Sequence, residues 1–275
     1  MSTETGQTMQ DFFKSVTIKR HPKSKCPVVF QCDDNFFDNF GRYNLLSCNK
    51  HKQDVHIHLI NPSNRLLKNL ENANLDIDLG YSFENIDTSI NRYKLKSYYF
   101  CARYFVANLL FECTDIEGTY ITDADIVFNK KVTFDKGVSL GMLYYPGYDN
   151  LWKQTGANFT YVRKDRKNFL ENVITEYQDR LKTTDFNSIT EDMDKITKAN
   201  LYALDQVCMS TALKQEKSFT NLTENPNFIS KDREKTDIWS LTGGNQKYDT
   251  LVHMYLKDKF SDDLQRINKY KFERL

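Results

Sequence analysis

The sequence lacks several features that would assign the protein to a special class. It contains no run of about eighteen apolar residues, so we expect no transmembrane helix. The first sixteen residues, MSTETGQTMQDFFKSV, are polar and lack the apolar centre of a secretory signal. Neither charge sign dominates, because 38 Lys and Arg against 37 Asp and Glu leave a formal net charge of +1. No global field therefore favours nucleic acid or an anionic membrane as partner.

Cysteine is present without the spacing of a metal or redox motif. The six cysteines contain no CxxC pair, and several fall within apolar segments. This distribution predicts buried free thiols in a reducing compartment rather than a disulfide framework or a zinc site. We therefore expect a cytoplasmic protein.

What is present indicates one α/β domain. Aromatic residues make up 13% of the 275 residues, which favours a packed globule over disorder. Short apolar segments alternate with amphipathic ones, and this alternation predicts a parallel-rich sheet flanked by helices. Strands are predicted at 27–32, 55–61, 120–128, 132–134 and 138–145, and at 159–162 after a glycine-containing turn. Helices are predicted at 36–46, 63–74, 93–112, 167–183, 201–215 and 251–267.

The stretch YITDADIVF, Tyr120 to Phe128, carries the strongest functional signal. Asp123 and Asp125 are one residue apart, and in a strand such residues point to the same face. Two carboxylates so placed could bind one Mg²⁺ or Mn²⁺, which accept carboxylate oxygens and often share them with substrate phosphates. The tripeptide alone would also fit a solvated loop. The apolar flanking residues favour a metal or phosphate site instead.

Two further features have an ordinary and a functional interpretation. Arg103 lies within the apolar helix predicted at 93–112, where a long cation needs a partner, an anion or a route to the surface. Snorkelling and a phosphate or sugar contact are equally compatible with the sequence. His56 and His58 alternate with apolar residues in the strand at 55–61. They could bind a metal, but we expect a solvated face or a sheet edge.

Several segments in this order resemble the GT-A nucleotide-sugar glycosyltransferases. The closest similarity is to the retaining family of glycogenin and the bacterial lipooligosaccharide galactosyltransferases. FQCDDNFF resembles the first strand of that family, and CARYF resembles its arginine-containing helix. YITDADIVF resembles the DXD strand, LDQVCMSTAL the Asp-Gln segment, and GGNQK the closing loop with its lysine. The resemblance covers about residues 28–247.

The resemblance implies a single GT-A, Rossmann-like domain with a mostly parallel mixed sheet. That domain would span residues 25–250, between an N-terminal arm at 1–24 and a C-terminal helix at 251–275 that packs on the domain or trails from it. It also implies a site. Metal ligands would be Asp123 and Asp125, and the catalytic residues would be Asp205 and Gln206. Donor contacts would come from Cys32, Asp33, Asp34, Arg103, Asp123, Ala124, Asn158, Gly244 and Lys247.

Two segments depart from the family pattern. The family usually carries a third metal ligand, a histidine, shortly before the late lysine, but Leu241 stands there between Ser240 and Thr242. The family's Asn-Ala-Gly turn is written here as Gly156-Ala157-Asn158.

The resulting hypothesis is a glycosyltransferase dependent on Mn²⁺ or Mg²⁺. It would move a hexose from a nucleotide diphosphate sugar, with a UDP-hexose as the expected donor, to a hydroxyl acceptor with retention. The acceptor could be a glycan, a lipid or a protein. The alternatives are a sugar-nucleotide-binding protein without turnover and a metal-dependent nucleotidyltransferase.

Overall fold

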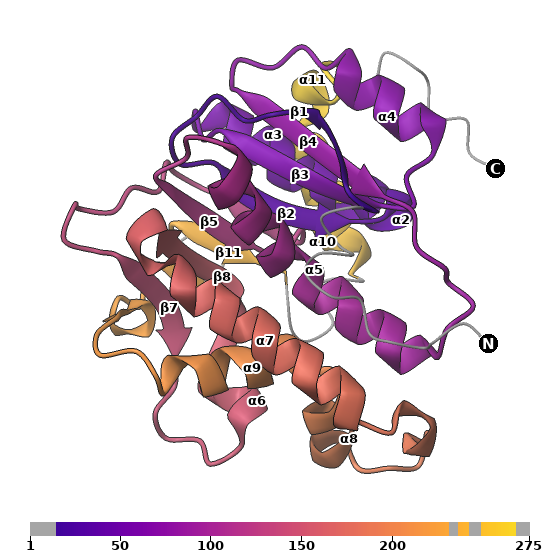
Figure 1. The fold of residues 1–275 in the computed structure, drawn as a ribbon. Coiled ribbons are helices and arrows are strands. Elements are labelled where there is room, and N and C mark those ends of the chain that lie inside the picture. The colour runs from indigo at the N-terminus through magenta and orange to yellow at the C-terminus, as the bar shows by residue number, and fades with distance from the viewer. Residues whose placement is uncertain (1–14, 231–235, 242–248, 268–275) are drawn as a thin grey trace.

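A computed structural model describes residues 15–230, 236–241 and 249–267 (Figure 1). Its main sheet has eight strands in the order β1-β4-β3-β2-β5-β8-β7-β9. The strands are β1 Thr17–Arg20, β4 Leu79–Glu84, β3 Val55–Ile60, β2 Val28–Cys32, β5 Gly118–Thr122, β8 Thr155–Arg163, β7 Leu140–Tyr144 and β9 Thr220–Asn221. The four central strands from β4 to β5 are parallel, whereas β1 and β8 pair antiparallel with their neighbours. The predicted α/β fold with a mixed, mostly parallel sheet is confirmed.

A smaller sheet of three strands lies beside the main one. It contains β10 Ile229–Ser230, β11 Ile238–Ser240 and β6 Ile126–Phe128. The antiparallel pairing of β11 with β6 joins the late part of the chain to the residues just after Asp125. The turn that contains Asp125 is therefore fixed on both sides, because β5 before it belongs to the main sheet and β6 after it pairs with β11 in the small sheet.

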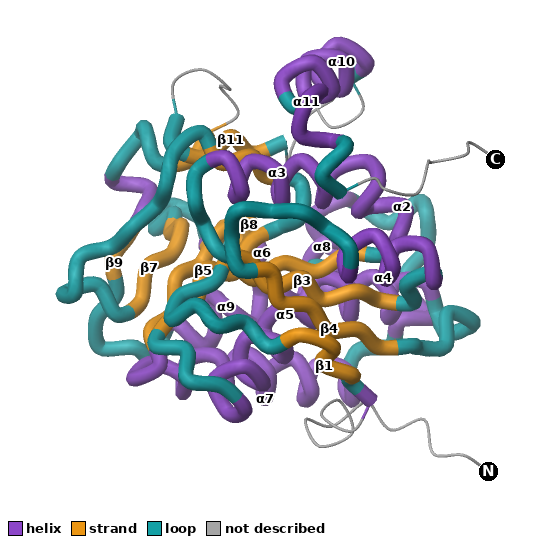
Figure 2. The backbone as a smooth tube through the Cα atoms, turned by 90° about the horizontal axis from the view of Figure 1, so that it is seen from above, coloured by secondary structure: helices purple, strands orange, loops and turns teal. Residues whose placement is uncertain are grey.

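Helices cover both faces of the main sheet (Figure 2). One face packs against α5 Arg92–Cys113, α7 Lys167–Thr183 and α9 Leu204–Leu213. The other face packs against α3 Arg42–Lys50 and α4 Asn64–Glu71, and α10 Thr250–Lys259 lies outside α3 and adds Val252 and Leu256 to the same core. The shorter helices are α2 Asp34–Phe36, α6 Leu151–Gln154, α8 Lys195–Tyr202 and α11 Ser261–Leu264, with a π-helical turn at Phe37–Gly41 and 3-10 turns at Lys164–Arg166, Phe186–Ser188 and Leu222–Glu224.

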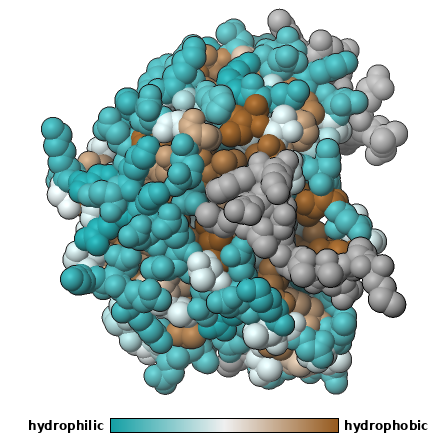
Figure 3. Space-filling view, in the orientation of Figure 1, coloured by the Kyte–Doolittle hydropathy of each residue, from teal (hydrophilic) through white to brown (hydrophobic). Residues whose placement is uncertain are grey.

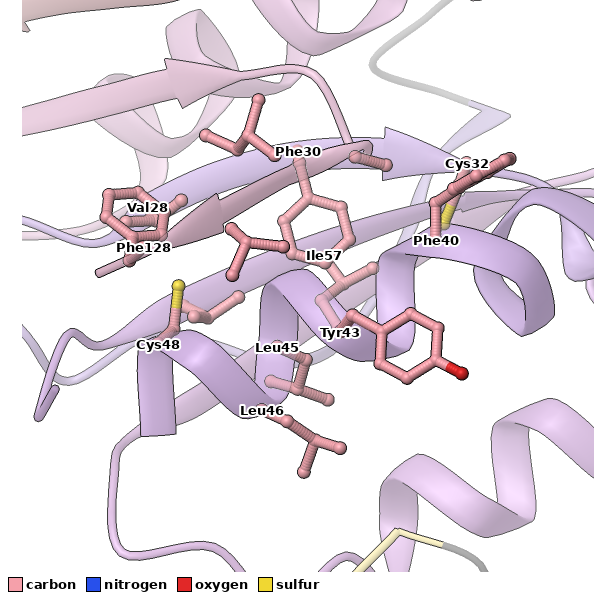
Figure 4. Close-up of a cluster of buried hydrophobic side chains, with 14 of the residues drawn as sticks. Val28, Phe30, Cys32, Phe40, Tyr43, Leu45, Leu46, Cys48, Ile57 and Phe128 are labelled. Atoms are coloured by element: carbon pink, nitrogen blue, oxygen red, sulfur yellow. The ribbon is translucent and has the colours of Figure 1, made fainter. Parts of the chain in front are cut away.

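Alternate side chains of β2 point to opposite faces of the main sheet and so contribute to two hydrophobic cores, one on each face. Val28 and Phe30 belong to the core on the α3 side, while Val29 between them belongs to the core on the α5 side. Figure 4 shows Val28, Phe30 and Ile57 of the sheet facing α3. β2 is apolar on both faces because both are covered by helices, as is usual for a parallel strand.

Several predicted elements are confirmed with small changes at their ends. The long central helix predicted at 93–112 is α5, and Asn91 caps its first turn by accepting from the backbone N–H of Tyr93 at 2.8 Å. The helix predicted at 167–183 is α7 with the same ends. The predicted strand at 132–134 is wrong, since these residues form no strand. The glycine-containing turn predicted at 155–158 is also wrong, because β8 begins at Thr155.

Described residues near both ends of the chain pack against the rest of the domain. Residues Thr17–Arg20 of the predicted N-terminal arm form β1, which pairs with β4 at the edge of the main sheet. In the C-terminal segment, Val252 and Leu256 of α10 and Phe260 after it pack into the core on the α3 side.

The expected exposure of His56 and His58 is wrong. Both side chains are fully buried between β3 and its neighbours. Ser82 Oγ lies 2.9 Å from His56 Nε2 and 3.0 Å from His58 Nδ1, and Glu84 Oε1 lies 3.1 Å from His58 Nε2. β4 supplies the partners of His56 Nε2 and of both ring nitrogens of His58, whereas the buried His56 Nδ1 has no hydrogen-bond partner among the described residues.

No helix in the described ranges combines the length and the apolar character needed to cross a bilayer. The surface seen in Figure 3 is largely hydrophilic, with hydrophobic residues gathered in separate small patches.

Candidate active site

The parallel pairing of β2 with β5 sets the position of the site. Val28 pairs with Tyr120 and Val29 with Ile121, so the carboxyl ends of the two strands meet at one edge of the sheet. Cys32 is the last residue of β2 and Asp33 follows it, and the acidic turn 123–125 follows β5. Ligands of open α/β sheets bind at this edge, outside the carboxyl ends of the strands.

Two adjacent cavities open at this edge. The first, which we name the nucleotide cavity after the ligand proposed for it below, has a volume of about 540 Å³ and is lined by Cys32, Asp33, Tyr99, Asp123 and Asp125 among others. The second, which we name the sugar cavity in the same way, has a volume of about 600 Å³ and includes Asn158, Asp205 and Gln206 in its lining. Lys96, Phe100 and Asp123 line both cavities. The structure thus brings most of the predicted site residues to one continuous region.

The acidic pair lies in a turn rather than within one strand. β5 ends at Thr122 and β6 begins at Ile126, so the strand predicted at 120–128 is interrupted at the acids. Asp123 and Asp125 nevertheless line the same cavity, with Ala124 between them. Asp125 is almost fully buried, and its carbonyl accepts a 3.0 Å hydrogen bond from the N–H of Leu241.

Arg103 joins the two cavities. Its Nη1 lies 2.8 Å from Asp123 Oδ1, and its Nη2 lies 2.9 Å from Asp205 Oδ2. Nη2 also donates to the carbonyl of Ala157 at 3.0 Å. Arg103 is 3% exposed, so it does not snorkel to the surface. A planar guanidinium can hold two carboxylates and a carbonyl at once, which an ammonium group does less well.

Burial and the charges of Arg103, Asp123 and Asp205 determine the pKa values in this cluster. Burial raises the pKa of Asp205 to about 6, Arg103 acts to lower it, and the nearby Asp123 adds to the rise. Burial acts to lower the pKa of Arg103, but Tyr104, Asp123 and Asp205 outweigh it and the net shift is upward. Arg103 therefore remains charged, while Asp205 can change its protonation state within the physiological range.

The two acids after β2 have different surroundings. Asp33 lines the nucleotide cavity and also caps α2, with its Oδ1 accepting from the N–H of Phe36 at 2.7 Å. Asp34 Oδ1 accepts from the N–H of Ser63 at 3.0 Å, and its Oδ2 lies 3.8 Å from Arg65. Asp34 is thus directed to α4, whereas Asp33 remains at the cavity.

Asn158 connects the two sheets beside the acidic turn. Its side-chain amide donates to Ser240 Oγ at 3.1 Å, and its carbonyl accepts from the N–H of Asp123 at 3.2 Å. Ser240 ends β11, and Leu241 after it is buried against the turn. Leu241, which stands where the resemblance would place a histidine ligand, therefore lies next to Asp125.

A set of hydroxyl groups fixes the far side of the sugar cavity. Thr155 Oγ1 donates to the carbonyl of Gln206 at 2.9 Å and lies 3.1 Å from Ser210 Oγ. Ser210 Oγ donates to the carbonyl of Leu151 at 2.7 Å. We call the four residues that these hydrogen bonds connect the hydroxyl clasp: Leu151, Thr155, Gln206 and Ser210. It ties α6, β8 and α9 to one another around the cavity.

Sequence reasoning missed two groups of lining residues. Lys96 lies one turn before Phe100 on α5 and lines both cavities, but it is one of many charged residues in the sequence. Tyr145 and Tyr148, between β7 and α6, line the sugar cavity together with Trp152 of α6. The run YYPGY around them was available as a signal, since aromatic residues beside Pro and Gly indicate an exposed loop.

Gly244 and Lys247 lie outside the described residues, so their predicted donor contacts remain predictions.

The acidic turn fits a divalent cation that shares its ligands with a substrate. In the described part of the chain, no three His, Cys, Asp or Glu side chains form a ready metal site. Asp123 and Asp125 provide two carboxylates at one cavity wall. Mg²⁺ and Mn²⁺ need no more than one or two protein carboxylates when phosphates and water complete the shell. The residues present therefore suit such an ion together with a diphosphate.

Comparison with known proteins adds information on the fold. No family model matches the sequence, and no curated protein matches it. Among solved structures, the chain is similar to the apo structure of WbbM, a bifunctional glycosyltransferase, with a TM-score of 0.54 and 16% sequence identity. The match covers 91% of this chain and 51% of that one, so the chain spans about half the length of the matched structure. At this identity the similarity shows the fold.

Proposed function

We propose that the protein is a glycosyltransferase that moves a hexose from a nucleotide diphosphate sugar to a hydroxyl acceptor, with retention. One observation carries this proposal: Arg103 holds Asp123 of the nucleotide cavity and Asp205 of the sugar cavity at 2.8 and 2.9 Å. Such a donor consists of an anionic nucleoside diphosphate and a neutral hexose. We assign the nucleoside diphosphate to the nucleotide cavity and the hexose to the sugar cavity. The similarity of fold to a glycosyltransferase chain supports the same conclusion.

The nucleotide cavity would take the nucleoside diphosphate. Tyr99 and Phe36 give it apolar walls for a base, and Asp33 at the end of β2 can accept hydrogen bonds from ribose hydroxyls. Asp123 and Asp125 would hold Mn²⁺ or Mg²⁺ at the diphosphate. The ion supplies positive charge that stabilises the leaving diphosphate. A UDP-hexose is the donor that we expect.

The protein's own cations would act on the same leaving group. Lys96 lies where the two cavities meet, which is where the bond between sugar and phosphate would lie. Its ammonium group can stabilise the negative charge that grows on the diphosphate as this bond breaks. Lys247 is proposed to add to this charge, as the resemblance to the family implies.

Asp205 and Gln206 would act on the sugar. Asp205 is 5% exposed and fixed by Arg103, so its position in the sugar cavity is well defined. As a carboxylate it can stabilise the positive charge that develops at the anomeric carbon. Gln206 has a partly exposed side chain and a backbone carbonyl held by the hydroxyl clasp. Its amide is a weak nucleophile, so we assign it to orienting the sugar.

The proposal is tested by thermal unfolding with nucleotide sugars, each with and without Mn²⁺. A ligand at 100 times its Kd should stabilise the protein by about 2.7 kcal/mol. We expect stabilisation by a nucleotide hexose that depends on Mn²⁺. Turnover is then followed by product analysis. Nucleoside diphosphate indicates glycosyl transfer or donor hydrolysis, whereas pyrophosphate indicates nucleotidyl transfer, and binding without any product indicates a non-catalytic protein.

A further inference from the structure

The sugar cavity carries a group of exposed aromatic side chains that the donor does not account for. Tyr145 is 40% exposed and Tyr148 is 50% exposed, and both line the cavity together with Trp152. In the described part of the chain, exposed large hydrophobic residues also include Ile90, Leu251 and Met254, which line neither cavity. Exposed aromatic residues that gather at a cavity indicate a binding surface rather than chance exposure.

The aromatic residues lie on a braced segment. The N–H of Tyr145 donates to the carbonyl of Gln154 at 2.8 Å, and the side-chain amide of Gln154 donates to the carbonyl of Tyr148 at 2.9 Å. The rings of Tyr145 and Tyr148 meet edge to face with centroids 6.4 Å apart. Lys153 lies over the rings of Tyr148 and Trp152. These contacts order the side chains before any ligand binds, which lowers the entropy cost of binding.

This segment is also fixed relative to the catalytic side of the cavity. α6 carries Trp152, and the carbonyl of Leu151 beside it accepts from Ser210 Oγ of α9 at 2.7 Å. The same helix α9 carries Asp205 and Gln206 in its first turn. The hydroxyl clasp therefore holds the aromatic residues and the residues proposed to face the donor sugar in one rigid arrangement. A ligand on the aromatic residues would be presented to that sugar.

We propose that Tyr145, Tyr148 and Trp152 form the acceptor subsite and that the acceptor is a carbohydrate. This inference rests on the proposed function and names its acceptor class. Flat aromatic faces pack against the C–H groups of a pyranose ring, while the hydroxyl groups of the exposed Tyr145 and Tyr148 can bond to sugar hydroxyls. A lipid acceptor would need a continuous apolar channel, whereas this cavity also contains Lys96, Lys153, Asp123 and Asp205. A protein acceptor would need a larger flat surface than a 600 Å³ cavity provides.

The experiment measures glycoside binding without donor, so that it does not depend on turnover. Saturation-transfer NMR is recorded for the wild-type protein with the methyl glycosides of glucose, galactose and mannose. Tyr148→Ala and Trp152→Ala are compared with Tyr148→Phe, which keeps the ring, and with Leu251→Ala, which removes an exposed side chain outside the cavity. Circular dichroism checks that each variant is folded, and binding of nucleoside diphosphate with Mn²⁺ is measured on the same samples.

We expect at least one glycoside to bind the wild-type protein, Tyr148→Phe and Leu251→Ala alike. Tyr148→Ala and Trp152→Ala should weaken this binding about tenfold, a typical effect of losing an aromatic contact. Nucleoside diphosphate binding should be unchanged in all variants. If glycosides bind equally to all variants, or to none while the nucleoside diphosphate still binds, the acceptor subsite is wrong and the proposed function stands. If the nucleoside diphosphate also fails to bind, the proposed function itself is wrong.

Discussion

Arg103 and Asp205 are 102 residues apart in the sequence, and their side chains form a buried ion pair of 2.9 Å. The same guanidinium holds Asp123 at 2.8 Å. One cation therefore serves two carboxylates from different elements, and both carboxylates lie at the proposed site. A buried charge cluster of this kind is costly to break and specific in its geometry.

The first prediction concerns this cluster. Arg103→Ala would leave two acids without their cation and should lower the free energy of unfolding by about 3–5 kcal/mol. Arg103→Lys should be less destabilising but should still weaken donor binding, because a lysine cannot reproduce the forked contacts. Arg180→Ala is a matched control, since Arg180 forms a partly exposed pair with Glu176 at 2.6 Å. It should cost less than about 1 kcal/mol in urea unfolding. Equal effects of Arg103→Ala and Arg180→Ala would contradict the cluster's role.

The second prediction uses the raised pKa of Asp205, about 6 in the fold. In the unfolded chain an Asp has a pKa of about 3.9, so between these values the folded state binds the extra proton. The contribution of Asp205 to stability is therefore greatest below pH 4 and is lost as the pH rises through 6. Asp205→Asn does not titrate and so does not lose this stability. Between about pH 4 and 6, the free energy of unfolding of the variant minus that of wild type should therefore rise by about 1.4 kcal/mol per pH unit. A difference that does not change with pH would contradict the assignment.

The third prediction concerns His56, whose effect on the free energy of unfolding changes with pH in the direction opposite to that of Asp205. Burial lowers the pKa of His56 to about 3, and the nearby His58 and His21 add to the shift. Below about pH 6.5 His56 is protonated in the unfolded chain but stays neutral in the folded protein. His56 therefore lowers the free energy of unfolding as the pH falls towards 3. In urea unfolding, His56→Gln relative to wild type should therefore gain stability as the pH falls, by about 1.4 kcal/mol per unit. Between pH 4 and 6 this trend is opposite to that of Asp205→Asn.

The fourth prediction concerns Lys96, which lines both cavities. Lys96→Ala should raise the Kd of a nucleoside diphosphate about tenfold, the usual effect of losing a charged contact. The Kd of the free nucleoside should be nearly unchanged. Lys182→Ala provides the control, because Lys182 is an exposed residue of α7 that pairs with Asp179. Calorimetry that finds the same loss for nucleoside and nucleoside diphosphate would remove Lys96 from the phosphate contacts.

The sequence predicts the alternation of strands and helices well because burial imposes a clear period on each segment. α5 and α7 keep an apolar face over their whole lengths, so their ends are found within a residue or two. The strand at 132–134 fails because Val132 is buried without pairing in a sheet, and a short apolar run carries no information on pairing.

The site could be predicted only in part. Asp123, Asp125 and Asp205 lie at the cavities, as the motifs indicate. The ion pairs of Arg103 could not be read from the sequence, because they depend on the packing of α5 against β5 and α9 rather than on any local pattern. The buried positions of His56 and His58 could not be read for the same reason, since their hydrogen-bond partners Ser82 and Glu84 lie on the neighbouring strand.

The most direct measurement of the central claim is product analysis of a UDP-hexose incubated with Mn²⁺. Wild-type protein should release UDP and the free or transferred hexose. Asp125→Asn removes one carboxylate oxygen charge while keeping the side chain's shape, so it should remain folded and lose Mn²⁺-dependent release of UDP by at least about 100-fold, a loss typical of a group that stabilises the transition state. Asp165→Asn, a change at an exposed acid outside both cavities, should behave like wild type. Release of pyrophosphate instead of UDP, or full activity of Asp125→Asn, would contradict the account.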